Sequence, residues 1–69
     1  MPSLNYPVKI RDDERVRINV CEGSVHLTHE ERDSRGRWHG INGGHIGPLS
    51  RKQAEELSDA IKRGLANGF

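Results

Sequence analysis

The chain has 69 residues, of which 30% are charged and 32% hydrophobic, so it forms one small domain and a two-domain enzyme is excluded. Its formal net charge is +1, far below a histone-like excess, so any nucleic-acid partner must be recognised by a local cluster of charge. Cys21 is the single cysteine, which excludes an internal disulfide framework and favours a reducing, cytoplasmic compartment. Charges interrupt every apolar run, so the sequence predicts neither a signal peptide nor a membrane span.

With 32% hydrophobic residues in a chain of this length, few apolar side chains are available to form a core. At this size, burial at about 25 cal/mol per Å² nearly cancels an ordering cost of about 1.5 kcal/mol per residue. We therefore expect a symmetric homodimer. The candidates for its apolar contact surface are Leu4, Tyr6, Ile41 and Ile46.

The clearest element is a strand over 15–21, where polar and apolar side chains alternate strictly. A two-residue turn at Glu22-Gly23 leads into a second strand over 24–30. The resulting register pairs apolar side chains across the hairpin, Val20 with Val25 and Ile18 with Leu27.

Two further strands flank this hairpin. Apolar residues of one parity predict a strand over 6–11, followed by a polar turn. A turn at 33–36 lets the chain return as a short fourth strand over 37–41, with Trp38 on the apolar side opposite Glu31.

Residues 40–48 hold four glycines and predict a loop, because glycine in a regular element costs conformational entropy. Ser50 and Gln53 then form a capping box that predicts a helix over 51–67. One helical stripe is apolar and consists of Ala54, Leu57, Ile61 and Leu65. The predicted fold class is α+β, an antiparallel sheet of three or four strands with one C-terminal helix packed on one face.

The outward face of the sheet gathers basic side chains, whereas most carboxylates fall in turns or on the helix. We predict that this face binds a partner through Lys9, Arg11, Arg15, Arg17, Asn19, His26, Thr28, Arg37 and His39. The alternative is a solvated polar face that serves solubility and edge protection. Because Tyr6 and Trp38 have the parity of the core, this face lacks the aromatic side chains that would stack on single-stranded RNA.

A second candidate site would hold an anion such as phosphate. It combines backbone donors of the glycine-rich segment with two cations at the helix start, and its residues are Gly43, Gly44, His45, Arg51 and Lys52. Neither the phosphate-loop pattern nor the dinucleotide fingerprint is present, which favours a flexible connector instead.

A metal site and a catalytic site are both weaker interpretations. Cys21 and the scattered histidines His26, His29, His39 and His45 lack the paired spacing of structural zinc ligands, so we expect no metal. His29 has core parity opposite Val16, which favours a hydrogen-bonded structural histidine. An enzyme could draw on Cys21, His26, His29, Glu30 or Glu31, but one sheet and one helix leave little room for a concave, water-excluding pocket. We expect no cofactor and no catalytic activity.

The order of a small sheet followed by one helix is loosely similar to the arm-binding domains of phage-type integrases, and that resemblance implies binding of duplex DNA through the sheet. Small size without a catalytic signature is also typical of an inhibitor or accessory protein encoded by a phage or another mobile element. A net charge of +1 gives little long-range field. The sequence therefore favours an acidic protein surface as the partner, with duplex DNA as the alternative.

Overall fold

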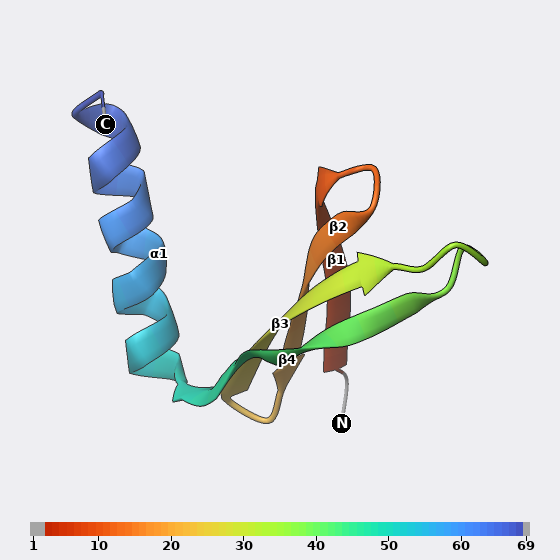
Figure 1. The fold of residues 1–69 in the computed structure, drawn as a ribbon. Coiled ribbons are helices and arrows are strands. Elements are labelled where there is room, and N and C mark those ends of the chain that lie inside the picture. Colours follow the sequence, from red (N-terminus) through yellow and green to blue (C-terminus); the bar gives the residue numbers. More distant parts are fainter. Residues whose placement is uncertain (1–2, 69) are drawn as a thin grey trace.

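The structure is a computed structural model and describes residues 3–68. Four antiparallel strands lie side by side in chain order and one helix follows, so the predicted α+β class is confirmed with all four strands present (Figure 1). The ends of the elements differ from the predicted ranges by a few residues, except in the fourth strand. The elements are β1 (Ser3–Arg11), β2 (Glu14–Cys21), β3 (Ser24–Arg32), β4 (Trp38–Ser50) and α1 (Arg51–Ala66).

The β2–β3 hairpin has the predicted register, with Val20 opposite Val25 and Ile18 opposite Leu27. Glu22 and Gly23, which form its turn, have positive φ values of 49° and 80°. A two-residue turn with two positive φ values matches the right-handed twist of the flanking strands. The local sequence of the turn therefore sets which side chains share a face.

The predicted loop over 40–48 is wrong, because β4 runs through the whole glycine-rich segment. Its pairing with β3 shifts at two places, and at each shift extra residues of β4 leave the ladder as a bulge. Gly43 and Gly47 have φ values of 80° and 141°, so these glycines supply backbone conformations that other residues rarely adopt. The glycines do mark irregular backbone, but the irregularity is a pair of bulges within a strand and not a loop.

The start of β4 also presents the opposite face from the one predicted. Trp38 pairs with Arg32, and His39 pairs with Glu31, so the expected position of Trp38 opposite Glu31 is wrong by one residue. Because side chains alternate between the two faces of a sheet, this single step moves Trp38 away from the apolar side.

Helix α1 begins at Arg51, as predicted. The Ser50 hydroxyl accepts a hydrogen bond from the Gln53 N–H at 3.2 Å, and the Gln53 side chain accepts one from the Ser50 N–H at 2.9 Å. This confirms the capping box and makes Ser50 both the last residue of β4 and the cap of the helix. Within residues 3–68 no helix is long and apolar enough to cross a membrane.

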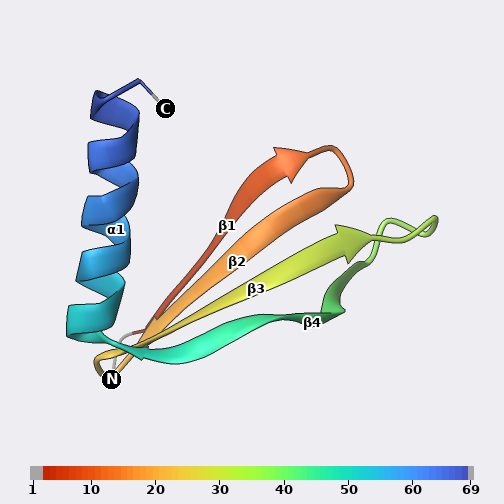
Figure 2. The same cartoon turned by 60° about the vertical axis from the view of Figure 1, so that its left-hand side comes forward.

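Helix and sheet diverge from this junction like the arms of a V (Figure 2). Their apolar sides face each other across an open groove of about 410 Å³, called the groove below, which is lined by Val8, Val16, Ile18, Val25, Leu27, Leu49, Ala54, Leu57, Ser58 and Ile61. None of residues 3–68 is buried. The predicted apolar faces thus oppose one another, but across a groove and without a closed core between them.

Two glycine substitutions test the pairing of β4. A Cβ on Gly44 would lie 2.9 Å from the Cβ of His29 and 3.0 Å from the carbonyl oxygen of Ile41, so Gly44→Ala should lower the free energy of unfolding by about 1–3 kcal/mol. In α1 a Cβ on Gly64 meets nothing within 4 Å, and Gly64→Ala should raise the free energy of unfolding by about 0.5–1 kcal/mol. Urea denaturation measures both values, and equal effects of the two substitutions would contradict the bulged pairing of β4 with β3.

Candidate functional site

The side of the sheet opposite to the groove is called the polar face below. Strand pairing places its members directly across from one another, Lys9 opposite Arg15, Asn19 opposite His26, and Arg17 opposite Thr28. These pairs bring together part of the predicted partner-binding set, namely Lys9, Arg15, Arg17, Asn19, His26 and Thr28.

Three other residues of the predicted set do not lie there. Arg11 follows a register shift in β1 and donates to Glu14 at 2.9 Å. His39 lies one step out of the expected register, with its Nε2 2.6 Å from Asp33. Arg37 belongs to the β3–β4 turn, where its N–H donates to Asp33 at 2.9 Å. In each case a bulge or a turn breaks the simple alternation on which the prediction depended.

The centre of the polar face holds an acid whose pairing the sequence analysis missed. Arg15 Nε donates to Glu30 Oε1 at 2.7 Å, and Arg17 Nε lies 3.2 Å from both carboxylate oxygens. Arg17 also donates to the side chain of Asn5. The predicted hairpin register already places Glu30 opposite Arg15, so the signal was present. The centre of the polar face therefore carries one carboxylate against two guanidinium groups.

Glu30 and its two arginines form a half-buried network. Burial raises the pKa of Glu30, but hydrogen bonds from Arg15 and Arg17 outweigh that effect and hold the pKa below its usual value of 4.5. The exposed fractions are 13% for the Glu30 side chain, 17% for Arg15 and 25% for Arg17. The ionised carboxylate therefore holds both guanidinium groups in fixed positions.

Trp38 completes this cluster. Its ring lies 4.2 Å from the Arg15 guanidinium carbon and 5.7 Å from that of Arg32, within range of a cation–π attraction. The tryptophan is half-buried on the polar face, where the sequence analysis had no aromatic residue. We call Arg15, Arg17, Glu30, Arg32 and Trp38 the Arg–Trp cluster.

A histidine pair lies on the same face. His26 and His45 stack with ring centroids 5.2 Å apart, and Nδ1 of His26 is 3.0 Å from Nε2 of His45. One nitrogen must donate and the other accept, so at least one ring is neutral while this contact lasts. The bulge in β4 brings His45 opposite Thr28 and so onto the polar face.

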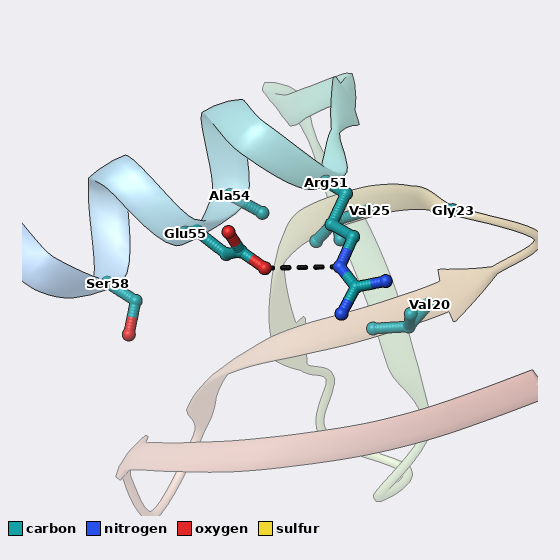
Figure 3. A pocket seen from close by; sticks show the side chains of 7 residues that line it. All are labelled: Val20, Gly23, Val25, Arg51, Ala54, Glu55 and Ser58. Carbon is teal, nitrogen blue, oxygen red and sulfur yellow. Dashed lines mark hydrogen bonds and ion pairs between the residues drawn. The ribbon is translucent and has the colours of Figure 1, made fainter.

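The candidate anion site does not form one cluster. Gly43 and Gly44 lie in β4, and residues 45–50 separate them from Arg51 by about 20 Å of extended chain. Lys52 follows in the first turn of α1. Figure 3 shows Arg51 at the start of α1, where its guanidinium is bonded to Glu55 at 3.1 Å. Arg51, which was expected to face a phosphate, is thus already paired with the carboxylate of Glu55.

His29 lies opposite Val16 on the groove side, as predicted, and its Nε2 is 2.9 Å from Glu14 Oε2. That hydrogen bond holds the pKa of Glu14 below its usual value. His26 lies on the other face, so the two histidines do not meet. Within residues 3–68 no group of three or more histidine, cysteine, aspartate or glutamate side chains could hold a metal ion. Cys21 is exposed.

Comparisons with protein families, with curated proteins and with solved structures find nothing that matches this chain. Any function must therefore be inferred from the side chains of the polar face and of the groove.

The Glu30 network predicts a pH-dependent stability. Because the folded-state pKa of Glu30 is lowered, its ionised form stabilises the fold above pH 4.5, and that contribution is lost as the pH falls through the folded-state pKa. Glu30→Gln should lower the free energy of unfolding by about 1–3 kcal/mol at pH 7 and should reduce the further loss on acidification. Urea denaturation at pH 7 and at pH 3 measures both effects.

The matched control is Glu56→Gln, which alters an exposed carboxylate on α1 and should leave the acid dependence unchanged. Parallel pH profiles for the parent chain and Glu30→Gln would show that the arginine pairs do not stabilise the fold.

Proposed function

We propose that this protein is a small non-enzymatic binding protein whose polar face recognises an acidic protein surface. The observation that carries the proposal is the Arg–Trp cluster, in which Glu30 fixes Arg15 and Arg17 beside the half-buried ring of Trp38. Tryptophan and arginine are the residues in which the energetic centres of protein interfaces are enriched.

The arginines are oriented before a partner arrives. Arg15 uses its Nε to bind Glu30, and its terminal guanidinium nitrogens make no hydrogen bond within residues 3–68. Those nitrogens can form paired hydrogen bonds with a carboxylate of the partner. Because the side chain is already held in place, binding loses less conformational entropy than it would with a mobile arginine.

The charge balance favours protein over nucleic acid. A phosphate that approached Arg15 and Arg17 would also approach the Glu30 carboxylate, and the chain has a net charge of only +1. An acidic protein group on the arginines approaches the same carboxylate, but a partner surface of mixed polarity carries fewer negative charges than duplex DNA and can also place an apolar group on Trp38. Duplex DNA bound through the same face is the alternative.

We further propose that the protein acts in the cytoplasm, as a homodimer, in the role of an inhibitor or accessory protein encoded by a phage or another mobile element. Its support is the chain length of 69 residues, the single exposed thiol at Cys21, and the lack of any buried side chain within residues 3–68.

Substitutions in the Arg–Trp cluster test the binding face. Protein partners captured from a cell lysate by the parent chain are identified and purified, and their affinities for the variants are then measured. We expect Arg17→Lys and Trp38→Ala each to weaken binding by about 1–3 kcal/mol, because the first removes a guanidinium that holds Glu30 and Arg15 in place and the second removes contact area. Arg63→Lys, on α1, is the matched control and should bind like the parent chain.

Equal affinities for the parent chain and all three variants would show that the polar face is ordinary solvated surface. A random duplex oligonucleotide, titrated at several salt concentrations, tests the alternative. Tight duplex binding that falls steeply with salt and is lost in Arg17→Lys would replace the acidic protein with DNA.

A further inference from the structure

We propose that the groove between α1 and the sheet is the dimer interface, in which a second copy of this chain docks. The open sides of the two V-shaped molecules face each other, an arrangement called mouth to mouth below. The far half of each helix then covers the far half of the partner's sheet. This inference rests on the homodimer proposed above and is independent of the acidic partner.

The first support is the amount of exposed surface. The chain exposes 5611 Å², whereas a folded monomer of 7.8 kDa exposes about 4,400 Å². Its radius of gyration is 13.6 Å, against about 11 Å for a compact chain of this length. The excess of about 1,200 Å² exceeds the roughly 800 Å² that each partner buries in a standard interface. One copy thus carries the surplus surface that a stable dimer needs.

The second support is the location of the exposed apolar side chains, which lie on the two sides of the groove. Tyr6 pairs with Ile18, and Ile46 pairs with Leu27, so these side chains share the groove face of the sheet. Across from them the helix exposes its own apolar stripe. The exposed large apolar side chains are Leu4, Tyr6, Val8, Ile10, Ile46, Leu57, Ile61 and Leu65.

The dimensions of the two arms fit a closed pair. Helix α1 has 16 residues and a length of about 24 Å, and strand β2 has 8 residues and a length of about 27 Å. Two V shapes with nearly equal arms, related by a two-fold axis, enclose one apolar volume. Such an interface is self-complementary, as a symmetric dimer requires. A lone helix or peptide in the groove would leave the far ends of both arms exposed.

The third support is charge complementarity at the ends of the arms. At the far end of the sheet Glu14 lies directly opposite Glu31, an unfavourable pairing of like charges. Arg11 and His29 both contact Glu14, but Glu31 has no ion pair within residues 3–68. Near the far end of α1, Lys62 flanks the apolar stripe and has no ion pair in the same part of the chain. Docked mouth to mouth, Lys62 of each copy reaches the Glu31 of the other.

Leu65 gives the sharpest test, because its exposed fraction in a single copy is 70% and it does not line the groove. Leu65→Gln should leave a lone chain unchanged but weaken the dimer about tenfold or more. Sedimentation velocity from low to high micromolar concentration measures the dimer dissociation constant, and circular dichroism shows that the helix remains. Ala60→Gln, on the other side of α1, is the matched control and should dimerise like the parent chain.

A charge exchange tests the geometry independently of apolar burial. Lys62→Glu and Glu31→Lys should each weaken the dimer several-fold, and the double variant should recover much of that loss. An equimolar mixture of the two single variants should form heterodimers in preference to either homodimer.

A chain that stays monomeric at high micromolar concentration would overturn both the homodimer and this mode of docking. A dimer that is insensitive to Leu65→Gln and to the charge exchange would overturn the docking mode alone. Neither result bears on Arg17 and Trp38, whose variants test the acidic partner on the opposite face.

Discussion

The structure depends on the register of the β2–β3 hairpin. The turn at Glu22 and Gly23 fixes that register, and the register decides which side chains share a face. On one face it places Arg15 opposite Glu30, which organises the Arg–Trp cluster. On the other it places Ile18 opposite Leu27, which forms the floor of the groove. A slip of one residue would mix charged and apolar side chains on both faces.

The features that the sequence predicted correctly are those that depend on residues close together in the chain. The turn, the hairpin register and the capping box at Ser50 each depend on residues only a few positions apart. The side of the sheet on which Trp38 lies could not be predicted. It depends on how many residues of β4 bulge out of the pairing with β3, and a glycine-rich sequence permits bulges of different lengths. The open groove was equally hidden, since the angle between α1 and the sheet depends on backbone geometry at one junction. Glu30 was overlooked although its position was predictable.

The two faces of the sheet differ in how many of their charged or apolar side chains find partners within the chain. On the polar face, the charges of Arg15 and Arg17 already have a partner in Glu30, so this surface is stable in water and is available for recognition. On the groove face, helix and sheet each expose apolar side chains that no contact within residues 3–68 buries. Unsatisfied apolar surface gives the stronger drive toward association. The proposed assembly on the groove side and the proposed recognition on the polar side therefore use different residues.

The direct joining of β4 to α1 at Ser50 has a consequence for how such a chain tolerates insertions and deletions. With no linker between strand and helix, the loss of Leu49 or Ser50, which lie beyond the second bulge and pair with Val25 and Ser24, would change the direction in which the helix leaves the sheet. The same loss in the Asp33–Arg37 turn would alter only a surface connection. Length variation in this architecture is therefore confined to the turns and the bulges, and the last two residues of β4 set how the helix is placed on the sheet.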